Sequence, residues 1–206
     1  MLYLVTPHNE SIRDLIAKRE LGLFITPFTG IRQRADETWA ADNGAFTGFK
    51  ATKYLRMLEL LEPHAKSSLF VAVPDQVADW TTTLELYQHW NQKVAAYGYP
   101  RALVIQNGAT SEVIPWDDCE AIFIGGTTDW KLGPMAAQIS HVAKTKNKHL
   151  HMGRVNSLRR LMYANSIGCD SADGTFLKFG PDKNLGRLMR WIEAVHNAPQ
   201  TNLFAN

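Results

Sequence analysis

Two aspartates, Asp170 and Asp173, lie three positions apart in the stretch "GCDSADGT". A pair of carboxylates can share one proton or divide acid and nucleophile roles only if both face the same site. If this stretch is a strand, its period of two sends the two side chains to opposite faces. We therefore expect Asp173, at the end of the run, to be functional. Asp170 is expected to support the local structure by hydrogen bonding or a salt bridge to surrounding helices.

Other polar residues also follow short apolar runs directly. In parallel barrels the chemistry lies at the carboxyl ends of the strands, so these positions are candidates on geometry alone. They are His8, Thr29, Asp42 with Asn43, Asp75, Gln106 with Asn107, Gly125 with Gly126, Arg154 and Asp173. The set combines three carboxylates, several amides, a glycine pair and one arginine.

Two of these carboxylates also have simpler explanations. Asp42, in "ADNGAF", is well placed for a turn with Gly44, and Asp75 is well placed to cap a helix beginning near Ala78. The amide of Gln106 offers both a donor and an acceptor, which suits the edge of a planar heterocycle. Glycines in "IGGTTDW" allow a backbone to approach a ring closely, although an ordinary turn needs them too.

Two histidines, His149 and His151 in "HLHMGR", have the same-face spacing that binds metal in some barrels. Packing in the core is the favoured interpretation, because His8 is the only other histidine at a predicted strand end. Neither Cys119 nor Cys169 has the spacing of a zinc site. We expect no metal and no cofactor.

The elements that position these residues follow from eight apolar runs alternating with helix-like stretches or loops. The runs cover residues 2–6, 21–27, 38–42, 69–75, 101–107, 121–126, 149–153 and 167–173. Helices are expected over 10–20, 52–66, 78–97, 132–144, 157–166 and 185–196. Segments 28–37 and 109–119 are poor in helical pattern, and the first is a candidate lid or binding loop.

Eight strands with mostly helical crossovers predict an α/β fold, a compact (β/α)8 TIM barrel forming one domain over residues 1–206. A doubly wound open sheet is the competing architecture. It is disfavoured because "VTPHNE", after the first strand, lacks the glycines of a dinucleotide fingerprint.

Charge is distributed unevenly along the chain. Residues 131–190 contain eleven Lys and Arg against three Asp, a net charge of +8, whereas the rest of the chain carries −6. Such a basic segment fits a side that faces a polyanion, although a solvated surface gives the same composition. The N-terminal residues resemble no signal sequence and no run is long enough to span a membrane, so a cytoplasmic protein is expected.

Six short motifs, in order, resemble those of the tRNA-guanine transglycosylase superfamily. They are "ADNGAF", "FVAVPD", "LVIQNG", "IFIGGT", "HMGRVNS" and "GCDSADG", covering about residues 38 to 175. The cysteine-rich zinc site of the larger enzymes is absent, and "GTFLKFG" stands where basic residues usually follow the last aspartate. The chain looks more like the short, phage-associated, DpdA-like branch that acts on DNA and is linked to 7-deazaguanine insertion.

The resemblance implies cleavage of the N-glycosidic bond of a nucleobase in DNA, flipped out or single-stranded. Asp173 would be the nucleophile and Asp42 the general acid/base. The base would be bound by Asn43, Asp75, Gln106, Gly125, Gly126 and Met152. The nucleic-acid backbone would be held by Arg154, Asn156, Arg159 and Lys178.

Two outcomes share this apparatus. A free 7-deazaguanine entering the emptied pocket gives base exchange, whereas water gives excision and an abasic site. An RNA substrate, a non-catalytic DNA-binding barrel and a metal-dependent hydrolase using His149 and His151 are the alternatives.

Overall fold

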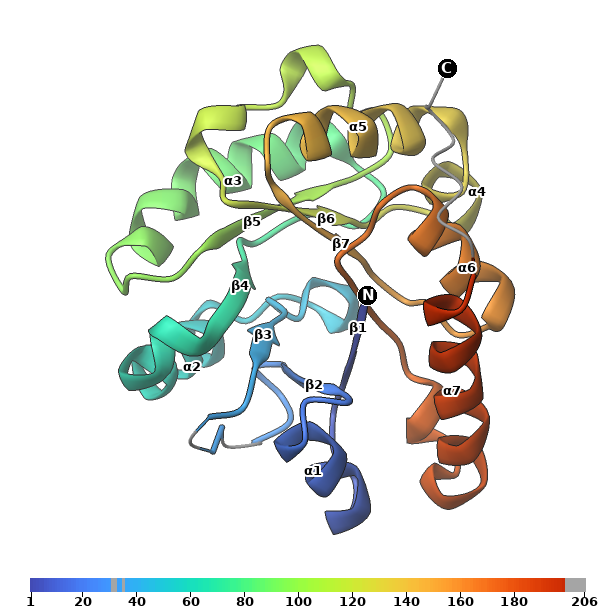
Figure 1. The fold of residues 1–206 in the computed structure, drawn as a ribbon. Helices are drawn as coiled ribbons and strands as arrows, with labels where there is room; N and C mark the ends of the chain where they lie inside the picture. Colours follow the sequence, from blue (N-terminus) through green and yellow to red (C-terminus); the bar gives the residue numbers. More distant parts are fainter. Residues whose placement is uncertain (31–32, 35, 199–206) are drawn as a thin grey trace.

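A computed structural model describes residues 1–30, 33–34 and 36–198 of the chain. Eight parallel strands form a closed barrel in which each strand pairs with the next and β8 pairs with β1 (Figure 1). The strands are β1 (Leu2–Val5), β2 (Gly22–Ile25), β3 (Trp39–Ala41), β4 (Ser68–Ala72), β5 (Arg101–Ile105), β6 (Ala121–Ile124), β7 (His149–Met152) and β8 (Ser171–Asp173). The predicted (β/α)8 barrel is confirmed, and the open sheet is excluded.

Helices cover the outside of this barrel, and each of the six predicted helical regions overlaps one of them (Figure 1). They are α1 (Glu10–Ala17), α2 (Ala51–Leu61), α3 (Trp80–Ala95), α5 (Pro134–Thr145), α6 (Leu158–Ser166) and α7 (Pro181–His196), with an additional short α4 (Thr128–Lys131). None of the helices in the described part of the chain is long and apolar enough to cross a membrane.

Some predicted boundaries were wrong for local reasons. The helix after β4 begins at Trp80 because Asp79 accepts a hydrogen bond from Thr82 N, so Asp79 and not Asp75 is the cap. Helix α7 begins four residues earlier than predicted, at Pro181, whose fixed φ suits a first helical turn. Segment 109–119 contains two 3-10 turns, and three residues of segment 28–37 (31, 32 and 35) lie outside the described residues.

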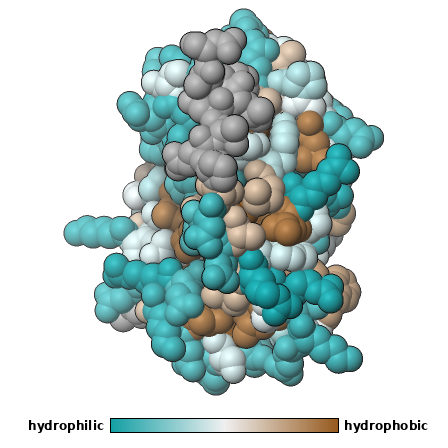
Figure 2. Space-filling view, turned by 45° about the vertical axis from the view of Figure 1, so that its right-hand side comes forward, coloured by the Kyte–Doolittle hydropathy of each residue, from teal (hydrophilic) through white to brown (hydrophobic). Residues whose placement is uncertain are grey.

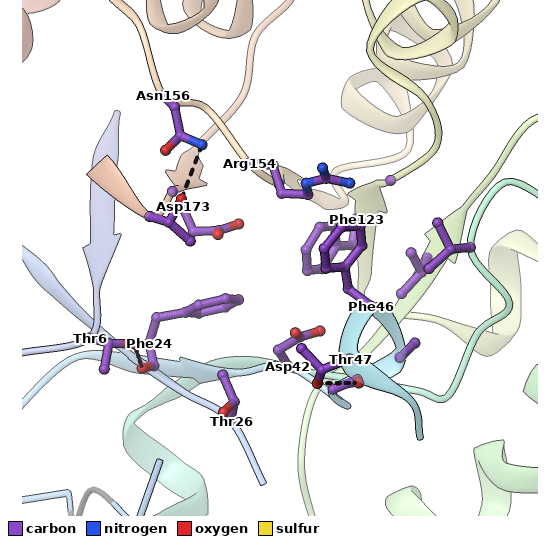
Figure 3. A pocket seen from close by; sticks show the side chains of 18 of the residues that line it. Thr6, Phe24, Thr26, Asp42, Phe46, Thr47, Phe123, Arg154, Asn156 and Asp173 are labelled. Atoms are coloured by element: carbon purple, nitrogen blue, oxygen red, sulfur yellow. Dashed lines mark hydrogen bonds between the residues drawn. The ribbon is translucent and has the colours of Figure 1, made fainter. Parts of the chain in front are cut away.

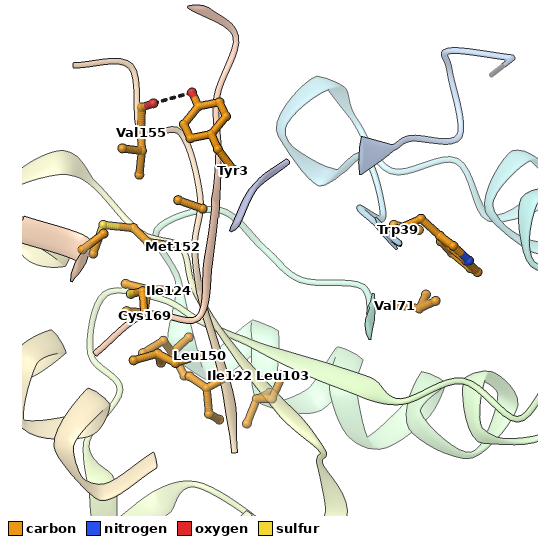
Figure 4. Close-up of a cluster of buried hydrophobic side chains, with 14 of the residues drawn as sticks. Tyr3, Trp39, Val71, Leu103, Ile122, Ile124, Leu150, Met152, Val155 and Cys169 are labelled. Atoms are coloured by element: carbon orange, nitrogen blue, oxygen red, sulfur yellow. Dashed lines mark hydrogen bonds between the residues drawn. The ribbon is translucent and has the colours of Figure 1, made fainter. Parts of the chain in front are cut away.

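Strand parity separates the buried side chains into two sets. One set fills the barrel interior: Leu4, Phe24, Ala40, Phe70, Ala72, Ala102, Val104, Ala121 and Phe123. The other set packs between the barrel and the helices, and Figure 4 shows part of it, with Ile122, Ile124, Leu150 and Met152 close together. Polar residues that continue the interior parity past the apolar layers therefore reach the carboxyl-end mouth of the barrel.

Asp170 faces away from that mouth, as predicted. It forms an ion pair with Lys144 on α5 at 2.7 Å, and its carboxylate accepts a hydrogen bond from Leu150 N at 2.8 Å. These contacts join α5, β7 and the start of β8. Asp170 thus supports the structure, and only Asp173 of the pair reaches the barrel mouth.

The outer core provides a stability prediction. Leu150→Ala should lower the free energy of unfolding by about 2–5 kcal/mol, because Leu150 is fully buried between β7 and the helices. Leu60→Ala is the matched control: Leu60 is 66% exposed on α2, and its loss should change stability by no more than about 0.5 kcal/mol. Urea unfolding measures both, and equal losses would contradict the assignment of this core.

A candidate active site at the carboxyl end of the barrel

A pocket of about 540 Å³ opens at the carboxyl ends of the strands. This volume lies within the range of about 300–1,000 Å³ typical of small-molecule sites. Nine of the predicted site residues line it: Asp42, Asp75, Gln106, Gly125, Gly126, Arg154, Asn156, Asp173 and Lys178. Figure 3 shows Asp173 from β8 and Asp42 from the end of β3 directed toward the same space. Barrel closure thus brings together residues that are far apart in the sequence.

Asp75 lies in a network of side-chain amides. Its Oδ1 accepts from Asn43 Nδ2 at 2.7 Å, and its Oδ2 accepts from Gln106 Nε2 at 2.6 Å. Both bonds lower the pKa of Asp75, but burial outweighs them and the pKa is raised. Asn43 is fully buried and does not line the pocket. It therefore holds Asp75 in place by its hydrogen bond.

Gln106 fixes the backbone as well as Asp75. Its Oε1 accepts from Gly126 N at 2.7 Å and from Ala78 N at 2.8 Å. Gly126 has φ +76, a conformation that favours glycine. With Nε2 donating to Asp75, one N–H of the Gln106 amide remains for a ligand. The network therefore holds Asp75, Gln106 and the glycine turn as one unit.

Asp42 is the carboxylate with the least compensated environment. Its Oδ1 accepts from Asn43 N at 2.9 Å, and its carboxylate also accepts from the backbone N–H of Gly44, the residue with which a turn was predicted. Burial, followed by repulsion from Asp75 and Asp173, raises its pKa to about 7. Near neutral pH a substantial fraction of Asp42 is therefore protonated and able to donate a proton.

Asp173 is held by a residue that the sequence did not assign to the site. Its Oδ1 lies 3.0 Å from Nε2 of His151, a fully buried side chain in the barrel interior. The available signal was the pairing of β7 with β8, because residues at matching parity on neighbouring strands face the same side. Sequence analysis considered His151 only as a metal ligand or a core residue.

Lys131 is a second residue that sequence analysis missed. It lies on α4, lines the pocket although it is 2% exposed, and donates from Nζ to Gly153 O at 2.7 Å. Burial is the main cause that lowers its pKa to about 8, followed by the positive charge of Arg154, whereas Asp173 acts in the opposite direction. No motif marks this lysine, because the helix that carries it was not predicted.

Besides Asn43, two predicted site residues lie outside the pocket lining. Met152 follows His151 on β7, and parity turns its side chain outward into the core between the barrel and the helices, where it is 1% exposed (Figure 4). Arg159 lies in the first turn of α6, exposed and outside the pocket lining. The structure therefore brings neither of them to the pocket.

Cationic and aromatic groups lie at the rim. The guanidinium of Arg154 is stacked over Phe46, with its Cζ 4.0 Å from the ring centroid, and Phe46 is 62% exposed. Lys178 and Asn156 complete this side of the lining. Figure 2 brings the side of α6 and α7 forward and shows a mainly hydrophilic surface with small hydrophobic patches.

A metal centre is not formed by the two histidines of β7. Within residues 1–30, 33–34 and 36–198, no group of three or more His, Cys, Asp or Glu side chains is arranged to hold a metal ion. His149 and His151 instead share the hydroxyl of Ser171, each at 2.8 Å.

No protein-family model and no curated protein matches the chain.

The raised pKa of Asp42 predicts a pH-dependent stability. Between about pH 4 and pH 7 the folded chain keeps a proton on Asp42 that the unfolded chain has released, so its stability falls as the pH rises. Asp42→Asn has no such loss, and its stability relative to wild type should rise across this window. Each pKa unit corresponds to at most about 1.4 kcal/mol.

Urea unfolding at several pH values measures this difference. The control is Asp79→Asn. The pKa of Asp79 is lowered by its bonds to Thr82, so its titration changes the stability only below this pH range. A constant difference between Asp42→Asn and wild type from about pH 4 to pH 8 would contradict the raised pKa.

Proposed function

We propose that this chain cleaves the N-glycosidic bond of a nucleobase in DNA by double displacement. The observation that carries the proposal is the contrast between two carboxylates in one pocket: Asp42, whose pKa is raised to about 7, and Asp173, hydrogen-bonded by His151. Two carboxyl groups in different environments can divide acid and nucleophile roles. The resemblance of the ordered motifs to the tRNA-guanine transglycosylase superfamily assigns them the same roles.

The chemistry follows from these two roles. A lone pair of Asp173 attacks the anomeric carbon while the bond from that carbon to the base breaks, and protonated Asp42 gives its proton to the departing base. The product is a glycosyl ester on Asp173. In the second half-reaction Asp42 accepts a proton from the acceptor, which attacks the same carbon and releases the Asp173 carboxylate. A 7-deazaguanine acceptor gives exchange, and water gives excision.

The remaining lining suits a planar base on a phosphate chain. Asp75, the free N–H of Gln106 and the backbone at Gly125 and Gly126 offer hydrogen bonds at one side of the pocket. Phe46 at the rim supplies an exposed ring for stacking, and Arg154 and Lys178 supply positive charge for phosphate. DNA is proposed over RNA because the motifs resemble the short DNA-acting branch, which lacks the zinc site.

Asp173→Asn should abolish base release, and Asp42→Asn should slow it by about 10²- to 10⁴-fold through loss of the acid/base group. The assay uses modified and unmodified DNA, and matched RNA, followed by alkali to reveal abasic sites. Asp170→Asn is the matched control, since Asp170 lies outside the pocket in an ion pair with Lys144. The asparagine keeps an oxygen that can accept from Leu150 N and so hold β8 in register, and this variant should retain wild-type activity.

The same assay separates the alternatives. Strand breaks without added base indicate a glycosylase, whereas incorporation of labelled 7-deazaguanine without breaks indicates a transglycosylase. If RNA reacts and DNA does not, the substrate is RNA. DNA binding with no reaction in wild type, or activity that survives Asp173→Asn, would refute the proposed chemistry.

The rim predicts a salt-dependent affinity. Arg154→Gln and Lys178→Gln should each weaken binding to single-stranded DNA across sequences and reduce the slope of log K against log salt by about 1. Lys18→Gln is the control, because Lys18 is exposed at the end of α1 and outside the pocket lining. Binding is measured by fluorescence anisotropy at several salt concentrations, and an unchanged slope in both rim variants would contradict the assignment.

A further inference from the structure

A continuous chain of hydrogen bonds runs through the barrel interior to Asp173. His149 Nε2 lies 2.8 Å from Ser171 Oγ, which lies 2.8 Å from His151 Nδ1. His151 Nε2 lies 3.0 Å from Asp173 Oδ1. His149 is half-buried, Ser171 and His151 are fully buried, and Asp173 reaches the pocket. Only the Asp173 end of this chain therefore meets a ligand in the pocket.

The order Ser171, His151, Asp173 contains the residue types of a serine-hydrolase triad, but the geometry is different in one decisive respect. Ser171 has no exposed surface, whereas Asp173 is part of the pocket lining. The serine therefore cannot reach a substrate, and the group presented to the pocket is the carboxylate. The imidazole of His151 bonds to the carboxylate of Asp173 from the barrel interior.

We propose that His151 is a positioning residue for Asp173: it binds Oδ1, stabilises the charged carboxylate and leaves Oδ2 for attack on the anomeric carbon. The inference rests on the proposed function, because it assigns Asp173 as the nucleophile. In the glycosyl ester, Oδ1 becomes the carbonyl oxygen and still accepts from Nε2. The same bond then stabilises the carboxylate when the acceptor displaces it.

The bonding pattern supports one direction of donation. Ser171 has a single O–H, so it can donate to only one of its two histidine neighbours, and the other must donate to it. With Asp173 ionised and His151 neutral, Nε2–H donates to Asp173 and Nδ1 accepts from Ser171. His149 Nε2–H then donates to Ser171. Burial lowers the pKa of His149 to about 4, so His149 is neutral near pH 7 and available for this role.

Aromatic rings fix the imidazole plane. The ring of His151 lies 5.7 Å from that of Phe24 in a stacked arrangement, 4.9 Å from Phe70 and 4.5 Å from Phe123 edge to face. These side chains fill the barrel interior and leave His151 fully buried. A dry, packed surrounding strengthens a hydrogen bond to a charged group and holds its direction.

Other charged or titratable groups also act on Asp173. Tyr3 from β1, Asp42 from the end of β3 and Lys131 from α4 interact electrostatically with it. All three remain in a His151 variant, so a change in the pH profile of that variant reports the loss of the Nε2 donor.

The test compares His151→Asn with His151→Gln. The glutamine amide reaches the position of Nε2 and keeps a donor for Asp173, whereas the asparagine amide reaches only the position of Nδ1 and Ser171. His151→Asn should lower kcat for base release by on the order of 10- to 100-fold with KM nearly unchanged, the size expected for one hydrogen bond to a charged group. It should also shift the acid limb of the kcat profile to higher pH, because a carboxylate without this donor is protonated more readily. His151→Gln should recover most of both effects.

The activity assay uses the DNA on which wild type releases base, and circular dichroism confirms folding of each variant. A second measurement on wild type, the ¹⁵N spectrum of the imidazoles, should show the proton of His151 on Nε2 and a changed signal in Asp173→Asn. Wild-type rates and pH profiles in both His151 variants, or a proton on Nδ1 alone, would overturn this proposal and leave the proposed function standing. Activity that survives Asp173→Asn would overturn the proposed function, and this proposal with it.

Discussion

Pairing of β1 with β8 closes the sheet, with Leu4 in register with Asp173. Side chains alternate along every strand, and closure makes the inner faces of all eight strands enclose one interior. Above the apolar layers of that interior, the same parity delivers Asp42, Gln106 and Asp173 to a single pocket. Asp75 joins them from the loop that follows β4, out of phase with Phe70 and Ala72. An open sheet would leave its first and last strands apart, and Asp173 of β8 would not lie beside Leu4 of β1.

The three carboxylates of the pocket differ in how their burial is compensated. Asp75 receives two side-chain amides, and Asp173 receives an imidazole. Asp42 receives backbone N–H groups and faces the charges of the other two, so its pKa rises to about 7. A substantial fraction of Asp42 therefore holds a proton near neutral pH. This division is a consequence of packing three acids around one cavity.

Much of the fold, and the position of most candidate site residues, could be predicted from sequence. The eight apolar runs and their polar ends predicted the barrel and the convergence of Asp42, Asp75, Gln106 and Asp173, because the position at which an apolar run ends is a local property of the sequence. The partners of these residues were not readable in the same way. The contact of His151 with Asp173 depends on lateral pairing between strands, and the placement of Lys131 depends on a four-residue helix without an apolar pattern. Met152 was misplaced because its motif suggested a role that the parity of β7 forbids.

Asp170 and Asp173 illustrate how much a single strand decides. The two side chains belong to one short segment, yet Asp170 bonds to α5 and β7 on the outside, whereas Asp173 bonds to a buried histidine inside. A shift of one residue in the pairing of β8 would exchange their faces and place Ala172 toward the mouth. The two bonds made by Asp170 oppose such a shift, because both are lost if its carboxylate turns inward. The outer aspartate thus secures the register on which the position of the inner one depends.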